Sequence, residues 1–293
     1  MNPRLWWLRW SSRRPGARAW SLMGPGTAWI VAFFMVPLLF MLAYSFMPKG
    51  LYGGVESGFT FEHYVRLFDP LYIKIGVRTL VYSLGCTAIC LVFGYPVAYV
   101  ISRAGEWRNL LVFLVILPFW TSFLVRTFAM IFLMRDTGLI NTVLLATGLR
   151  TEPLEMMNTP FAVMTGLVYG FLPFMVLPIY SSLEKLDPSL LEAAEVLGAR
   201  PAARFVRVVL PLSMPGVVAG SLLVFIPALG SYLTSDLLGG AKEMMIGNLV
   251  QNQFMVANNW PFGSAASFTV MAMVLAAVFV SLRVRDEPAG EAR

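Results

Sequence analysis

Few side chains in this 293-residue sequence could do covalent or metal chemistry. Cys86 and Cys90 lie four residues apart in an apolar run, so they share one helix face and are predicted to be core residues rather than a disulfide. His63 is the only histidine, and no group of His, Cys or carboxylate residues has the spacing of a metal site. The sequence also lacks a phosphate-binding glycine loop, a Gly-x-Ser-x-Gly elbow and a dinucleotide-binding motif. We therefore expect no catalytic residue, no metal and no cofactor.

The composition is that of a membrane protein. Hydrophobic residues make up 58% of the sequence, charged residues only 13%, and the mean hydropathy is +0.71. A soluble domain carries about 25% charged residues, so 22 Lys and Arg with 16 Asp and Glu are too few to cover its surface. This excludes soluble enzymes and nucleic-acid-binding proteins. In a membrane protein, an excess of Lys and Arg such as this formal charge of +6 indicates which segments face the cytoplasm before it indicates an anionic partner.

Six stretches are long and apolar enough to cross a bilayer, which takes about 20 helical residues. We therefore predict an all-α, polytopic membrane protein with six transmembrane helices. The spans are expected near residues 26–47, 76–101, 109–134, 160–182, 214–235 and 264–282.

Basic residues are unevenly divided between the two sides of the membrane. Six spans put both termini on one side, and that side carries fourteen Lys and Arg outside the spans, against six on the other. The positive-inside rule then predicts that both termini are cytoplasmic. The apolar run after Arg13 and Arg14 is longer than a signal-peptide core, so we expect the first helix to remain uncleaved. The more basic side comprises residues 1–25, 102–108, 183–213 and 283–293.

Proline occurs inside five of the six predicted spans. Each proline removes a backbone hydrogen bond and bends its helix. The prolines indicate either the ordinary composition of transmembrane helices or a bundle that moves around a path, and the pattern alone leaves both interpretations open. They are Pro37, Pro96, Pro118, Pro173, Pro178 and Pro227.

The predicted cytoplasmic loop 183–213 has the pattern of two short helices. Asp187 can cap the first helix with Pro188 in its first turn, and Gly198 suits the left-handed residue that closes it. Arg200 and Pro201 restart the chain, and Pro211 is expected to end the second helix.

The surface of this loop indicates a binding role. Glu192 and Glu195 share a face, while Ala193, Ala194 and Gly198 keep part of the surface flat. Such a surface can fit a groove on another protein. The alternative is an amphipathic hairpin on the lipid headgroups, in which arginines meet phosphate. Those arginines would be Arg204 and Arg207.

The spacing within the loop decides between these alternatives. Glu192-Ala193-Ala194, three residues, Gly198, nine residues and Val208-x-Leu210-Pro211 match the EAA signature of ABC importer permeases, with Val in place of the usual Ile. The sequence thus resembles the type I, MetI-like ABC transmembrane subunits. That resemblance implies a loop that couples the permease to a cytoplasmic ATPase through Glu192, Ala193, Ala194, Gly198, Leu210 and Pro211.

Two further stretches resemble the B-type subunits of spermidine/putrescine importers. The first is Leu117-Pro-Phe-Trp-Thr-Ser-Phe-Leu-Val-Arg-Thr127, with Gly138-Leu-Ile-Asn141 downstream. The second runs from Phe225 to Gly263 and includes Asp236-Leu-Leu-Gly-Gly-Ala-Lys242. With the loop, these motifs cover most of residues 70–282, whereas the tails and residues 48–70 lack matching motifs.

The resemblance implies an organisation and a set of partners. We expect a basic cytoplasmic tail 1–25, a first helix 26–47, a type-1 transmembrane domain 72–282 and a cytoplasmic tail 283–293. The chain would lie in the lipid bilayer of the bacterial inner membrane, as one half of a pore made with a second permease subunit. A cytoplasmic ATPase dimer would hydrolyse ATP, a periplasmic substrate-binding protein would deliver the cargo, and no nucleic acid is involved.

A polyamine would need carboxylates and aromatic faces along its path. Asp236 and Tyr232, one turn apart at the outer end of the fifth span, are our candidates, and Trp120 is a second aromatic candidate. The alternative for Asp236 is a simple cap on the following loop. Arg126 would repel a cation in the path, so we expect it to snorkel or to pair with Asp236 or Asp136, and Arg78 is equally ambiguous.

Three alternatives remain for the function. The first is an ABC permease for another cargo, such as ferric iron, thiamine or a phosphonate. The second, a secondary transporter or channel, is disfavoured because no carboxylate or histidine lies near the middle of a span. The third, a membrane-embedded enzyme, lacks a catalytic constellation.

Overall fold

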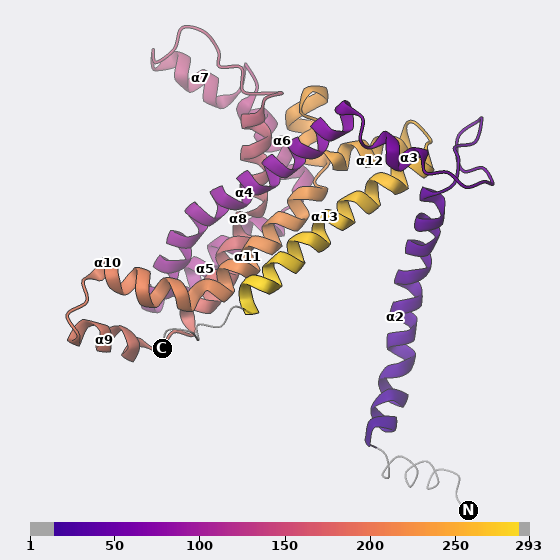
Figure 1. Ribbon diagram of the computed structural model, residues 1–293. Helices are drawn as coiled ribbons and strands as arrows, with labels where there is room; N and C mark the ends of the chain where they lie inside the picture. Colours follow the sequence, from indigo (N-terminus) through magenta and orange to yellow (C-terminus); the bar gives the residue numbers. More distant parts are fainter. Residues whose placement is uncertain (1–14, 287–293) are drawn as a thin grey trace, which may run out of the picture.

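The computed structural model describes residues 15–286 of the chain, and within this range six helices are long and apolar enough to cross a membrane (Figure 1). This confirms the predicted all-α class. The helices are α2 (Pro15–Ser45), α3 (Glu62–Arg66), α4 (Pro70–Arg103), α5 (Arg108–Ile116), α6 (Phe123–Met134), α7 (Leu139–Ala146), α8 (Pro160–Glu184), α9 (Pro188–Val196), α10 (Pro201–Arg204), α11 (Leu210–Gly230), α12 (Ile246–Met255) and α13 (Trp260–Asp286).

Helices α4, α8 and α11 pack against one another and form the centre of the bundle (Figure 1). Their facing side chains are apolar and fully buried, with Leu167, Met175 and Val224 among them. Cys86 and Cys90 belong to the same core as free thiols, with 3.9 Å between their Sγ atoms. The predicted core role of the two cysteines is therefore confirmed.

Glycine allows α8 and α11 to approach closely. A Cβ atom on Gly216 of α11 would lie 2.5 Å from the carbonyl oxygen of Pro178, closer than any real side chain comes. Gly220, one turn later, similarly faces Met175 of α8. Small residues serve this purpose in membrane bundles because association there depends on van der Waals packing.

Helix α2 stands apart from the bundle along most of its length (Figure 1). The apolar part of α2 that would span a membrane buries none of its residues inside the described structure. The main helical neighbour of α2 is α13. The rings of Tyr44 and Trp260 meet at 6.5 Å between centroids, near the end where α2 joins the following loop. The lone His63 is buried in α3 and its Nε2 lies 2.9 Å from the Met47 carbonyl oxygen.

The third predicted span is not one helix. Residues 109–134 form α5, a 3-10 turn Leu117–Trp120 and α6, separated by extended backbone at Thr121 and Ser122. Pro118 lies in the 3-10 turn, where its missing N–H cannot continue an α-helical ladder. After α6, helix α7 projects away from the bundle (Figure 1).

The expectation that Pro211 ends the second loop helix is wrong. Helix α10 continues through a π-helical turn, Phe205–Val209, into α11, so residues Pro201–Gly230 form one helical rod. Pro211 lies in the first turn of α11, directly after the wider π-helical turn, which accommodates a residue without an N–H. The rod ends at Gly230 because Ser231 is extended.

The chain ends differ in part from the predicted tails. Helix α2 already includes residues from Pro15 onward, and α13 continues to Asp286. Residues 1–14 and 287–293, which make up the rest of the predicted tails, lie outside the described part of the chain.

The packing of α11 on α8 can be tested by substitution. Gly216→Val should lower the free energy of unfolding by about 1–3 kcal/mol, the usual cost of overpacking, because the backbone of Pro178 cannot move aside. The measurement is the thermal unfolding midpoint of the purified chain in detergent. Gly26→Ala, in α2 with open space around its Cβ position, is the control and should leave the midpoint unchanged or higher.

Candidate functional site

The hairpin between α8 and α11 begins with a capped helix. The Asp187 carboxylate accepts a hydrogen bond from the Ser189 N–H (2.9 Å) and caps α9, as predicted. This hydrogen bond holds the pKa of the Asp187 carboxyl below its ordinary value. Gly198 closes the helix with φ of 77°, the left-handed conformation expected from the sequence. Arg200 is extended and leads into α10.

An ion pair joins the two helices of this hairpin. Arg204 Nη1 of α10 donates to Glu195 Oε2 of α9 at 2.6 Å, whereas Glu192 is exposed and forms no ion pair within residues 15–286. Arg204 is thus engaged within the protein. The headgroup alternative needed this arginine on phosphate, so the structure weakens that alternative.

Aromatic side chains fix the base of the hairpin on α4. Phe205 packs edge-on against Tyr95 and Tyr99, with ring centroids 5.6 and 5.7 Å apart. The guanidinium of Arg103 lies over the Tyr99 ring, 4.6 Å from its centroid. The Tyr95 hydroxyl and Ser213 Oγ form a hydrogen bond of 2.7 Å. The hairpin is therefore held at a defined position beneath the bundle.

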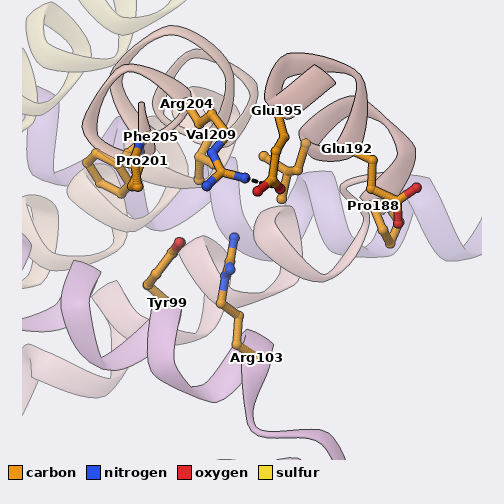
Figure 2. Close-up of a pocket in the computed structure, with 10 residues that line it drawn as sticks. Tyr99, Arg103, Pro188, Glu192, Glu195, Pro201, Arg204, Phe205 and Val209 are labelled. Carbon is orange, nitrogen blue, oxygen red and sulfur yellow. Dashed lines mark hydrogen bonds and ion pairs between the residues drawn. The ribbon is translucent and has the colours of Figure 1, made fainter. Parts of the chain in front are cut away.

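A cavity of about 310 Å³ lies between the hairpin and the end of α4. In Figure 2, Tyr99 and Arg103 point from α4 toward the hairpin, and the Arg204 to Glu195 pair lies across from them. Its lining combines cations, carboxylates and apolar groups: Tyr99, Arg103, Pro188, Leu191, Glu192, Glu195, Pro201, Arg204, Phe205 and Val209.

The tip of the hairpin exposes apolar side chains that sequence reasoning missed. Val196 is 88% exposed and Leu197 is 85% exposed, directly before the Gly198 turn. Exposed apolar groups next to charged ones are typical of a surface that binds a partner. The signal in the sequence was the pair of apolar residues between Glu195 and Gly198, where a surface helix would carry polar residues.

The structure separates the residues of the EAA signature into two groups. Glu192 and Ala193 are exposed on α9 and Ala194 is half-buried beside them. Leu210, by contrast, packs against the central core, and Pro211 lies in the first turn of α11. The first group can meet a partner, whereas Leu210 and Pro211 fix the root of the hairpin.

Asp236 and Tyr232 lie after α11, away from the hairpin. Asp236 belongs to a π-helical turn, Ser235–Gly239, and its N–H donates to the Tyr232 carbonyl at 2.8 Å. Both residues are exposed. The structure therefore brings the two candidates onto one accessible turn. It does not record a contact between the carboxylate and the ring.

Trp120 and Arg126 lie near the break in the third span. Trp120 is 77% exposed and packs edge-on against Phe113. The predicted pairing of Arg126 with Asp236 or Asp136 is wrong: among the described residues, its Nε and Nη1 are buried and donate no hydrogen bond. Instead, its guanidinium lies 5.6 to 6.0 Å from three ring centroids, those of Phe119, Phe123 and Tyr169.

Sequence reasoning also missed Glu243, which resolves the role of Arg78. Arg78 Nε lies 3.4 Å from Glu243 Oε2, and the Tyr82 hydroxyl donates to the same oxygen at 2.5 Å. The sequence motifs include the adjacent Lys242 but not Glu243. The pairing of Glu243 with Arg78 joins residues that are distant along the chain, so sequence spacing does not reveal it.

The comparison with known families agrees with this geometry. Residues 90–286 match the model of the family described as binding-protein-dependent transport system inner membrane component. The chain belongs to this family. It is accordingly a multi-pass inner-membrane protein of the ABC importer class, and its relatives are transport permease subunits.

Curated relatives are similar over most of their length. The spermidine/putrescine transport system permease protein PotB of Haemophilus influenzae is 44% identical over 257 residues, which is 87% of this chain and 90% of that protein. PotB of Escherichia coli K12 is 45% identical over 243 residues, or 83% of this chain and 88% of that protein.

Solved structures share the fold at lower identity. A bacterial ABC transporter that imports the acidic polysaccharide alginate matches with a TM-score of 0.67 and 19% identity, covering 96% of this chain and 99% of that one. The alginate transporter in complex with its alginate-bound periplasmic protein matches with a TM-score of 0.70 and 18% identity, covering 93% and 95%. These matches confirm the predicted type I permease fold.

The cap on α9 generates a testable expectation. Asp187→Ala should speed hydrogen exchange of the amides in residues 189–196 several-fold, because the helix loses its capping acceptor, whereas Asp187→Asn should retain most of the protection. Since the folded-state pKa is lowered, the protection in the wild-type chain should persist at neutral pH and fall as the pH drops through that pKa. Equal exchange in all three proteins would contradict the capping role.

Proposed function

We propose that this chain is a permease subunit of an ATP-driven importer that carries polyamines, spermidine or putrescine, across the bacterial inner membrane. The observation that carries the proposal is 44% identity to a spermidine/putrescine permease across nine tenths of that relative. The chemistry of the accessible turn is compatible with a cation, because Asp236 and Tyr232 offer a carboxylate and an aromatic face.

The α9–α10 hairpin would dock on the ATPase. In this proposal Glu192, Ala193, Ala194 and Gly198 form the docking surface, supported by their position on an exposed helix and turn. Val196 and Leu197 would enter an apolar part of the ATPase groove. Leu210 and Pro211 would transmit movement of the hairpin to the bundle, because they lie where it joins α11.

The remaining subunits follow from this assignment. We infer a second permease subunit that completes the pore, a cytoplasmic ATPase dimer that hydrolyses ATP, and a periplasmic binding protein that delivers the cargo. Both termini would face the cytoplasm, with residues 72–282 as the type-1 transmembrane domain. The hairpin and the Asp236 turn would then lie on opposite sides of the membrane, and Trp120 would be a further aromatic contact for the cargo.

The cargo assignment is tested in the complete complex reconstituted in liposomes. Labelled spermidine uptake should require both ATP and the loaded binding protein. Asp236→Asn should reduce it roughly five- to tenfold, the factor for losing about 1–1.4 kcal/mol of interaction with a cation. ATP hydrolysis without spermidine uptake would support an ABC permease for another cargo. Unchanged uptake in the Asp236→Asn variant would mean that Asp236 does not contact the cargo and only caps the following loop.

The coupling assignment is tested at the turn of the hairpin. Gly198→Asp should leave membrane insertion intact and abolish cargo-stimulated ATP hydrolysis, because it strains a left-handed residue and adds a charge to the docking surface. Gly148→Asp is the matched control, since Gly148 has φ of 69° and an equally open Cβ position in a different loop. Transport by the Gly198→Asp variant at the wild-type rate would show that the hairpin turn does not couple the permease to the ATPase.

A further inference from the structure

A polar cluster joins α4 to the segment that follows the Asp236 turn. We define it as Arg78, Thr79 and Tyr82 of α4 together with Glu243. Beyond the two contacts of the Glu243 carboxylate, Arg78 donates to the carbonyl oxygen of Lys242, and Thr79 Oγ1 accepts from the Ile246 N–H at 2.9 Å. One face of α4 therefore holds residues 242–246 through both side-chain and backbone groups.

The carboxylate of this cluster is shielded from solvent. The Glu243 side chain is 14% exposed and that of Arg78 is 23% exposed. A charge in such a site depends on its partners, and removing one partner leaves the other uncompensated. Glu243 is therefore held more firmly than the exposed Asp236, and its contacts define where its own segment lies.

The same segment carries the contacts that hold the candidate cargo residues. Ser235, next to Asp236, donates through Oγ to the Glu243 carbonyl at 2.5 Å. The Asn248 side chain donates to the Tyr232 carbonyl at 2.8 Å. Gly239 of the Asp236 turn also packs tightly against Glu243, because a Cβ atom on Gly239 would lie 2.6 Å from Glu243 Cβ. A continuous set of contacts thus runs from α4 through residues 242–248 to both candidates.

We propose that Glu243 is a positioning residue for the cargo path: its pairing with Arg78 and Tyr82 fixes the turn that presents Tyr232 and Asp236. Glu243 itself does not bind the cargo, since its carboxylate is already occupied by a guanidinium and a hydroxyl. The importance of this position for transport rests on the proposed function, whereas the placement of the turn does not.

The placement is tested without any cargo. Tyr232→Cys is introduced into the complete complex, and the rate at which a membrane-impermeant maleimide labels this chain is measured, the two native thiols of this chain being buried. Glu243→Gln should raise this rate at least threefold because the turn loses its fixed position, and Tyr82→Phe, which removes only one hydroxyl, should raise it less. Glu62→Gln, an exposed glutamate in α3, is the control and should change nothing. An unchanged rate in the Glu243 variant overturns the proposal.

A second measurement shows whether Glu243 acts through Asp236. Glu243→Gln should lower spermidine uptake, and the loss in the double variant with Asp236→Asn should be smaller than the product of the two single losses, because Glu243 acts in part through Asp236. Losses that multiply would mean that Glu243 acts elsewhere, which overturns the proposal. If the wild-type complex takes up no spermidine, the proposed function fails, while the labelling experiment still decides the positioning role.

Discussion

Helix α11 lies so close to α8 at Gly216 that the two backbones leave no room for a side chain between them. In a bilayer such an approach is what holds helices together, because lipid tails provide no hydrophobic drive for association. The position of α11 in turn fixes both candidate sites, since the hairpin leads into one end of this helix and the Tyr232 turn follows the other. The α8–α11 interface sets the position of α11, and the contacts of the hairpin and of the Tyr232 turn then adjust the two ends of this helix.

Local features were predictable because their physics is local. The Asp187 cap and the left-handed Gly198 each depend on a few neighbouring residues, and both occur as expected. The effect of a proline was less predictable. Helices α2, α4 and α8 continue through Pro37, Pro96 and Pro178, whereas the third span breaks after the turn that contains Pro118.

The two arginines near the ends of spans illustrate what a sequence does not contain. Arg78 and Arg126 looked alike, yet Arg78 meets a carboxylate while Arg126 lies among aromatic rings. The difference arises from tertiary folding, which brings Glu243 back to α4 across a long stretch of chain. The residues of the EAA signature also show that burial is not visible in a spacing pattern. Glu192 and Leu210 belong to the same pattern, but in the folded hairpin Glu192 is exposed and Leu210 packs against the core.

The continuity of residues Pro201–Gly230 has a mechanical meaning. At about 1.5 Å per residue, this rod is about 45 Å long, and a tilt of about 5° about one end displaces the other by about 4 Å. A push on the hairpin therefore acts through a lever arm that ends next to Tyr232. The π-helical turn lies in the part of the rod that would receive this push, while Pro215 and Pro227 interrupt the hydrogen bonding of the longer part.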